Sequence, residues 1–88
     1  MIKQKVRFII NPHSGIRLKQ EVQRMIIKYL NQQIFEYDIQ YTQYPKHATA
    51  LAKAAVLERI DIVVAVGGDG SVNEVAAGLI GTNTILGI

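Results

Sequence analysis

The spacing of hydrophobic and polar residues changes several times along this 88-residue chain, and each change predicts an element of secondary structure. Residues 5–11 carry a run of apolar side chains that stops at Asn11-Pro12, which is typical of a strand followed by a turn. Apolar residues then recur at spacings of three and four, which predicts a helix over residues 18–30 that ends before Asn31. Over residues 35–41 aromatic and apolar residues alternate with polar ones, which predicts a half-exposed strand near an edge of the sheet.

The second half of the chain repeats this order of elements. Pro45 suits the first position of a second helix, one face of which carries Ala48, Leu51, Ala52, Ala55 and Val56. The uninterrupted apolar run over residues 62–66 predicts a buried central strand. Gly81 suits the position just past a third helix over residues 72–80, whose apolar face is Val72, Val75, Ala76, Leu79 and Ile80. Residues 84–88 predict a fourth strand.

The regular alternation of strands and helices, βαβαβαβ, predicts an α/β fold. It implies a three-layer α/β/α arrangement, in which a parallel sheet of about four strands has helices on both faces. If the strands over 5–11 and 62–66 are neighbours, the chain reverses its direction across the sheet between them, and ligands bind beyond the carboxyl ends of strands at such a point. Because residues 84–88 are an apolar strand with nothing after it, we expect residues 1–88 to be one truncated domain of a longer protein.

The turn between the third strand and the third helix, Gly67-Gly68-Asp69-Gly70-Ser71, has the composition of a phosphate-binding corner. Backbone N–H groups at a helix start lack helical partners, the helix dipole favours an anion there, and glycines let a ligand approach closely. Asp69 would repel a phosphate unless a cation or a hydrogen-bond donor lies between them. Ser71 and Glu74 match a capping box, so we expect Glu74 to cap the helix rather than to take part in chemistry.

This turn differs from two better-known nucleotide-binding loops. It lacks the lysine and the spacing of a P-loop. It is not a dinucleotide fingerprint either, because Asn73 replaces the third glycine and the loop follows the third strand.

The loop after the first strand, Asn11-Pro12-His13-Ser14-Gly15, is expected to lie beside the glycine turn, where Asn11 and Ser14 would orient the loop or a ligand. His13 is interpreted as an exposed turn residue. Thr42 lies at the carboxyl end of the second strand, on the ligand-binding rim, and His47 is expected to be structural or exposed to solvent.

Composition excludes several classes of protein. The absence of cysteine excludes disulfides and thiolate metal sites and fits a reducing compartment. The net charge of +3 comes from basic residues scattered along the chain, which we interpret as a solvated surface. Without a dense basic stripe or an aromatic stacking platform, nucleic-acid binding is not expected. No apolar run approaches the roughly 18 residues that a membrane span requires.

Three groups of residues together resemble the diacylglycerol kinase catalytic-domain family, which includes bacterial lipid kinases and sphingosine kinases. They are the loop from Asn11 to Gly15, then Thr42 followed by His47-Ala48 and Leu51-Ala52, and then the loop from Gly67 to Val75. The glycine-aspartate loop by itself is shared with NAD kinases and phosphofructokinases, whereas the Asn-Pro-x-Ser-Gly loop and the Thr…His-Ala pair point to lipid kinases.

The resemblance implies that this chain binds ATP together with Mg²⁺. The nucleotide-binding residues that it implies are Asn11, Pro12, His13, Ser14, Gly15, Thr42, Gly67, Gly68, Asp69, Gly70, Ser71, Val72 and Asn73. The glycines would admit the phosphates, and Asp69 would act near them in a supporting role, through Mg²⁺. Neither a catalytic base nor a protein ligand for a metal is identified in the chain.

The resemblance also implies a lipid substrate with a hydroxyl group, such as diacylglycerol, which a cytoplasmic protein of phospholipid biosynthesis would meet peripherally at the membrane surface. The chain departs from the family at Ser71, where the usual residue is threonine, although the hydroxyl is kept. A Thr-Gly-Asn-Asp loop and a β-rich second domain, which in this family supply the catalytic base, bound Mg²⁺ and much of the lipid cleft, are missing. We therefore expect the 88 residues alone to be inactive.

Two other functions stay open at this point. Ser71 is compatible with a soluble-substrate kinase that resembles NAD kinase or phosphofructokinase. The apolar strand over 84–88 is compatible with a non-catalytic nucleotide-binding or assembly module that forms a homo-oligomer through an exposed sheet edge.

Overall fold

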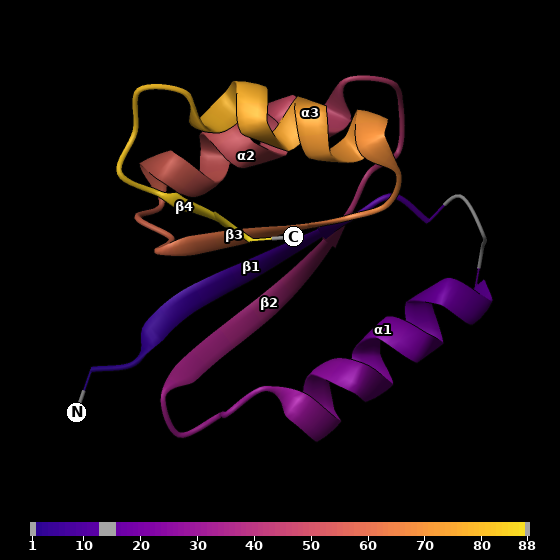
Figure 1. The fold of residues 1–88 in the computed structure, drawn as a ribbon, viewed down its shortest axis with the longest axis vertical. Helices are drawn as coiled ribbons and strands as arrows, with labels where there is room; N and C mark the ends of the chain where they lie inside the picture. Colours follow the sequence, from indigo (N-terminus) through magenta and orange to yellow (C-terminus); the bar gives the residue numbers. More distant parts are fainter. Residues whose placement is uncertain (1, 13–15, 88) are drawn as a thin grey trace.

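The computed structural model describes residues 2–12 and 16–87, and for residues 16–19 it describes the backbone only. Within them, strands and helices alternate in the order β1 (Gln4–Ile10), α1 (Ile16–Tyr29), β2 (Phe35–Tyr41), α2 (His47–Leu57), β3 (Ile62–Val66), α3 (Asp69–Leu79) and β4 (Ile85–Gly87). The strands form one parallel sheet in the order β2-β1-β3-β4 (Figure 1). The predicted α/β fold is therefore confirmed.

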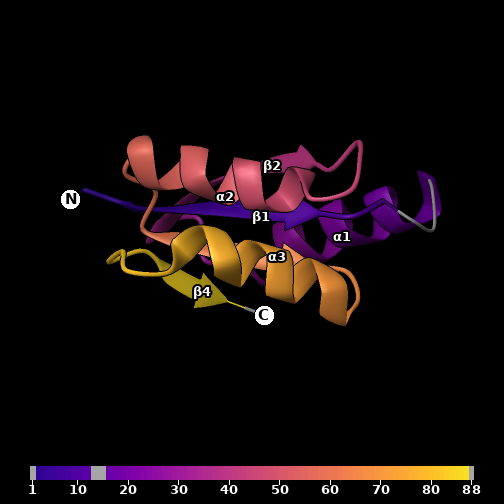
Figure 2. The ribbon, with the colours of Figure 1, turned by 90° about the horizontal axis from the view of Figure 1, so that it is seen from above.

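The helices lie on both faces of the sheet, as predicted. Helices α2 and α3 lie side by side over one face, and α1 lies on the opposite face (Figures 1 and 2). This division follows from right-handed crossovers, because the connection from β1 to β2 runs one way across the sheet and the next two connections run the other way. The main core fills the space between the sheet and α2 and α3, and its buried members are Ile9, Ala48, Ala52, Ala55, Ile60, Val63, Ala65, Val75 and Leu79.

The carboxyl ends of three strands lie close together. Strands β1 and β3 are interior neighbours, and β2 is an edge strand, as predicted. The backbone N–H of Asn11 donates to the carbonyl oxygen of Val66 at 3.0 Å, and the N–H of Thr42 donates to the carbonyl oxygen of Ile10 at 2.9 Å. The loops that follow β1, β2 and β3 therefore start from the same end of the sheet. Pairing of the outer edge of β4 with another chain stays a prediction.

Helices α2 and α3 approach each other closely because small residues face each other. Ala52 is fully buried, and a Cβ atom added to Gly78 would lie 2.7 Å from the Ala52 Cβ and 2.7 Å from the Thr49 carbonyl oxygen. The Thr49 hydroxyl donates a hydrogen bond of 2.7 Å to the carbonyl oxygen of Glu74. The absent side chain at position 78 therefore sets the separation of the two helices.

The start of α3 corrects one prediction. The helix begins at Asp69, three residues earlier than expected, and Gly68 is its N-cap with no side-chain hydrogen bond. The capping box of Ser71 and Glu74 is therefore wrong. Ser71 is the third helical residue, and its own N–H donates to the carbonyl oxygen of Gly68 at 3.0 Å.

Two other helix ends also differ from expectation. Pro45 does not open α2, because Lys46 takes a left-handed conformation with φ of 68° and the helix begins at His47. Ile80 is not part of the apolar face of α3, since the helix ends at Leu79 and Ile80 is 80% exposed. Gly81 follows with φ of +75°, which confirms its predicted place just past the helix end. The ends of β1, α1 and β4 lie within two residues of those predicted, and Ile88 is outside the described residues.

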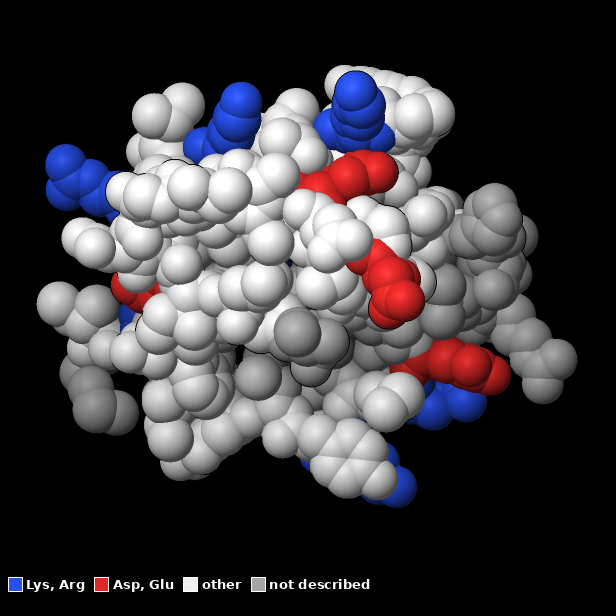
Figure 3. Space-filling model, turned by 45° about the horizontal axis from the view of Figure 1, so that its top comes forward, with Lys and Arg blue, Asp and Glu red and all other residues white. Residues whose placement is uncertain are grey.

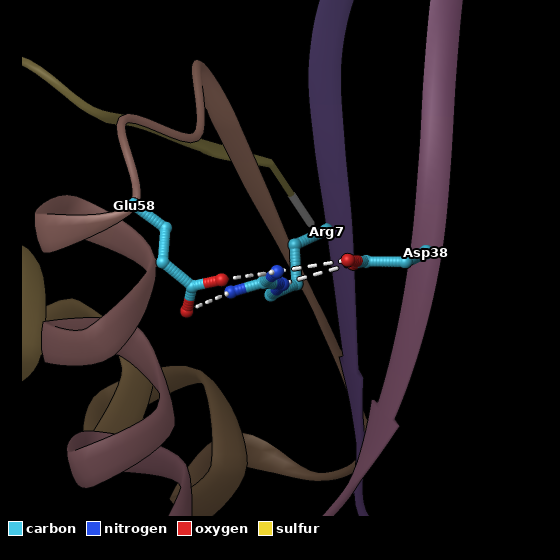
Figure 4. Close-up of polar contacts among 3 residues, drawn as sticks. All are labelled: Arg7, Asp38 and Glu58. Atoms are coloured by element: carbon cyan, nitrogen blue, oxygen red, sulfur yellow. Dashed lines mark hydrogen bonds and ion pairs between the residues drawn. The ribbon is translucent and has the colours of Figure 1, made fainter.

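Arg7 corrects the view that the basic residues form only a solvated surface. Its side chain is 6% exposed and forms ion pairs with Asp38 on β2 and with Glu58 just after α2 (Figure 4). Arg7 thereby links β1, β2 and the end of α2. Four hydrogen bonds of 2.8–3.1 Å link the guanidinium to the two carboxylates. These hydrogen bonds, more than the charge of Arg7, hold the pKa of Glu58 below its ordinary value, and the two carboxylates raise the pKa of Arg7, so the guanidinium stays charged.

The face that carries α1 is less completely covered. A groove of ≈ 400 Å³ runs between this helix and the sheet, lined by Phe8, Val22, Met25, Ile26, Tyr29, Leu30, Val64 and Val66.

None of the described helices is long and apolar enough to cross a membrane. On the opposite face, acidic and basic side chains are scattered among uncharged ones and form no continuous stripe (Figure 3).

Candidate functional site

A cavity of ≈ 360 Å³ opens at the carboxyl end of the sheet, where the three loops meet. Asn11 comes from the end of β1, Thr42 from the end of β2, and Ser71 from the first turn of α3. The remaining lining residues are Gln43, Tyr44, Pro45, Ala48 and Glu74. Residues that are 60 positions apart in the sequence therefore share one small cavity, at the topological switch point where ligands of such sheets bind.

The backbone turn after β3 is shaped by Gly67. Its φ is +153°, a conformation that side chains rarely allow. A Cβ atom at this position would lie 2.5 Å from the Ser71 hydroxyl oxygen and 3.3 Å from the Asn11 Cβ. Gly67 is therefore required by the fold itself, because a side chain there would overlap with Ser71 and crowd Asn11.

Gly68 and Gly70 differ from Gly67, because the fold has room for a side chain at both positions. A Cβ atom added to either one would have no atom within 4 Å, so nothing in the described fold requires glycine there for lack of space. Both residues are exposed at the start of α3. The space around them is available to a ligand that approaches the backbone.

The start of α3 presents the groups that favour an anion. No side chain caps the helix, so the first N–H groups of α3 lack a side-chain acceptor. The helix dipole adds a partial positive charge at this end. The exposed Asp69 carboxylate lies in the same turn, where it balances part of that charge and adds a negative group beside the expected phosphates.

The structure brings together only some of the residues predicted for the site. Asn11, Thr42 and Ser71 line the cavity, and the backbone from Gly67 to Gly70 lies at the same end of α3. Val72 instead packs against the hydrophobic core. Pro12 and Asn73 do not line the cavity, and His13, Ser14 and Gly15 lie outside the described residues. The nucleotide-binding role of all these residues stays a prediction.

Sequence reasoning missed five lining residues, of which Gln43, Tyr44 and Glu74 carry polar side-chain groups. Glu74 was assigned to a cap, although its position one turn beyond Ser71 on the same helix side is a signal that it faces the same space. Gln43 and Tyr44 lie in an irregular loop, for which no periodicity predicts a direction. His47 proves structural, as expected, because its Nδ1 accepts a hydrogen bond of 3.0 Å from the N–H of Gln43.

The carboxylates near the cavity do not form a metal site of their own. Among residues 2–12 and 16–87, no group of three or more His, Cys, Asp or Glu side chains is placed to hold a metal ion. Mg²⁺, however, is commonly held by one or two carboxylates together with substrate phosphates and water. Asp69 fits that pattern, in which the ion arrives with the nucleotide.

These features together suit a ligand with an anionic end and a polar, uncharged end. The anionic end would meet the backbone N–H groups at Gly67–Gly70, since Glu74 makes the cavity that it lines unfavourable for negative charge. The hydroxyls of Thr42 and Ser71 and the amide of Asn11 supply both donors and acceptors between the two ends.

Comparisons with known proteins show the family to which this chain belongs. The family model described as the diacylglycerol kinase catalytic domain matches residues 5–88. A diacylglycerol kinase from Bacillus subtilis (strain 168) is 34% identical over 76 residues, which are 86% of this chain and 25% of that protein. A diacylglycerol kinase from Staphylococcus aureus (strain JH9) is 37% identical over 79 residues, which are 89% of this chain and 25% of that protein.

A solved structure gives the same picture of the fold. It is a structure from Bacillus anthracis strain Sterne that is named as a diacylglycerol kinase. The two chains superpose with a TM-score of 0.68 and share 25% sequence identity. The match covers 94% of this chain and 30% of the solved one. The chain thus spans about a quarter of the length of the curated relatives that it matches.

Proposed function

Because the chain belongs to the diacylglycerol kinase catalytic domain family, we propose that it is the ATP-binding portion of a lipid kinase. In this proposal the γ-phosphoryl group of ATP is transferred to a lipid hydroxyl, such as that of diacylglycerol. The observation that carries the proposal is the cavity in which Asn11, Thr42 and Ser71 meet beside the uncapped start of α3.

The proposed binding of ATP requires several hydrogen bonds, because the glycine turn contains no lysine. A hydrogen bond to a charged group contributes roughly 1.5–3 kcal/mol, and micromolar affinity corresponds to about 8 kcal/mol, so three to five such bonds suffice. The N–H groups of Asp69 and Gly70, the two hydroxyls and the Asn11 amide would supply up to five donors, since the N–H groups of Ser71 and Val72 already donate to the Gly68 carbonyl oxygen. Phosphoryl transfer depends mostly on positioning and charge neutralisation, which suits a site built from loop backbone.

In this proposal Mg²⁺ binds together with the nucleotide. It would neutralise charge on the phosphates, and the Asp69 carboxylate would hold it, directly or through water. The chain's own residues would hold the phosphates at Gly67–Gly70. No catalytic base is assigned, and the chain alone is proposed to be inactive because its relatives are about four times longer.

Nucleotide binding is tested by calorimetric titration of the chain with MgATP. Gly68→Val is expected to abolish binding while leaving the fold intact, because a side chain there meets open space in the fold but occupies the proposed phosphate position. Ala77→Val, which adds two methyl groups at an exposed site near the other end of α3, is the matched control and should bind as the wild type does. Unchanged affinity of Gly68→Val would contradict the phosphate placement.

The acceptor is tested with the full-length protein that the proposal implies. It is offered diacylglycerol in mixed micelles, NAD and a sugar phosphate in parallel assays, each with MgATP. We expect phosphorylation of the lipid at the surface of the micelle. A strict preference for either soluble acceptor would overturn the lipid-kinase proposal and favour the soluble-substrate alternative, and phosphorylation of diacylglycerol by the 88 residues alone would contradict their proposed inactivity.

A further inference from the structure

Tyr44 gives the cavity one aromatic wall. It lies in the loop between β2 and α2, lines the cavity with Thr42 and Ser71, and is 53% exposed. Its ring stacks on the imidazole of His47, with ring centroids 4.1 Å apart and the two planes inclined by 25°. Because the imidazole covers one face, the exposed part of the Tyr44 ring lies on its other face and its edge.

Hydrogen bonds hold this aromatic pair in place. The N–H of His47 donates to the carbonyl oxygen of Tyr44 at 3.1 Å, and the N–H of Gln43 donates to His47 Nδ1 at 3.0 Å. The loop is anchored to the sheet by the N–H of Thr42, which donates to the carbonyl oxygen of Ile10 at 2.9 Å. The Tyr44 ring is therefore a supported surface within the loop.

The charges around the cavity decide which part of a nucleotide comes to this surface. The positive end of the α3 dipole and the uncapped N–H groups lie at Asp69 and Gly70, where they attract phosphate when Mg²⁺ offsets the charge of the Asp69 carboxylate. The Glu74 carboxylate lies in the same cavity as Tyr44 and repels phosphate from that region. A nucleotide bound in the opposite direction would place its negative charges beside Glu74 and leave the helix start without an anion.

From this arrangement we infer that Tyr44, supported by His47, stacks against the base of the bound nucleotide and distinguishes a nucleotide from a bare polyphosphate. The inference rests on the proposed nucleotide-binding function and adds the residue that recognises the base. Stacking of a base on an aromatic side chain tolerates any base, because every base has a π-face, so we expect ATP and GTP to benefit alike.

The experiment compares calorimetric titrations with MgATP, MgGTP and magnesium tripolyphosphate, all on the same 88-residue chain. The wild type should bind MgATP about tenfold more tightly than tripolyphosphate. Tyr44→Ala should lose this advantage, with affinity for tripolyphosphate unchanged, and Tyr44→Phe should retain it because the ring is kept. Tyr29→Ala, at an exposed tyrosine on α1 that is outside the cavity, is the control and should behave as the wild type does.

Proton NMR distinguishes stacking from a purely structural role of Tyr44, because only stacking would change the chemical shifts of the adenine protons. Stacking on Tyr44 should shift the adenine ring-proton signals of ATP upfield, and Tyr44→Ala should remove the shift. If the wild type binds MgATP and Tyr44→Ala binds it equally well, the inference is wrong and the nucleotide-binding proposal stands. Equal affinity of the wild type for MgATP and tripolyphosphate would also contradict the inference about Tyr44 and leave the nucleotide-binding proposal standing. If the wild type bound neither ligand, both the inference and the nucleotide-binding proposal would be wrong.

Discussion

Gly78 allows a quantitative test of how α2 and α3 are held together. In Gly78→Ala the new methyl group would lie 2.7 Å from the Ala52 Cβ, 2.7 Å from the Thr49 carbonyl oxygen and 3.3 Å from the Lys53 nitrogen. Ordinary contacts begin at 3.4 Å, and all three neighbours belong to the backbone or are attached directly to it. No side-chain rotation can relieve the overlap, so the two helices have to move apart.

Two effects of opposite sign decide the magnitude. Forcing an extra carbon into a well-packed contact typically costs about 1–3 kcal/mol. Replacing glycine by alanine inside a helix gains up to about 1 kcal/mol from backbone propensity. The packing cost exceeds the gain, so Gly78→Ala should lower the free energy of unfolding by about 1–2 kcal/mol. In a domain of this size that change lowers Tm by roughly 5–15 °C.

The assay is thermal and urea unfolding followed by circular dichroism, with Gly70→Ala as the matched control. Gly70 belongs to the same helix and is exchanged for the same residue, but a Cβ atom there would have no neighbour within 4 Å. Gly70→Ala should therefore be as stable as the wild type or slightly more stable. If Gly78→Ala matched Gly70→Ala in stability, the proposed steric origin of the α2–α3 separation would be refuted.

Three further predictions concern other glycines and charged groups. Gly67→Ala should cost about 1–3 kcal/mol in urea unfolding, because its φ of +153° and the Ser71 hydroxyl both oppose a side chain, and unchanged stability would contradict this. Since the pKa of Glu58 is lowered in the folded state, its contribution to stability is present above its ordinary value of 4.5 and is lost as pH falls through the lower folded value. The stability difference between the wild type and Glu58→Gln should thus shrink in acid, and a difference independent of pH would exclude this contribution. Under the proposed function, Asp69→Ala should abolish lipid phosphorylation by the full-length protein without unfolding it, and retained activity would contradict the supporting role proposed for Asp69.

The order of elements could be predicted from the sequence because each one has its own hydrophobic period. Buried alanines at positions 48, 52 and 55 recur at helical spacing, and the apolar residues of β3 occupy five consecutive positions. Helix ends were less predictable. Ser71 and Glu74 have the right types and spacing for a cap, but the extended backbone of Gly68 starts the helix three residues earlier.

The cavity could be predicted only in part. Parallel topology places Asn11, Thr42 and Ser71 at one end of the sheet, because they follow or lie near the ends of neighbouring strands. Tyr44 follows no periodic pattern, and its direction depends on a local turn with a left-handed Lys46. Arg7 was missed for another reason, since its partners Asp38 and Glu58 are 31 and 51 positions away.

The contact of α2 with α3 also bears on the free energy of ligand binding. Ala48 on α2 and Glu74 on α3 line the same cavity, and the hydrogen bond from Thr49 to the Glu74 carbonyl joins the two helices. The parts of the wall that come from α2 and α3 are thus joined before any ligand arrives. A ligand that enters does not have to order them, so little conformational entropy is lost on binding and the cavity is preorganised.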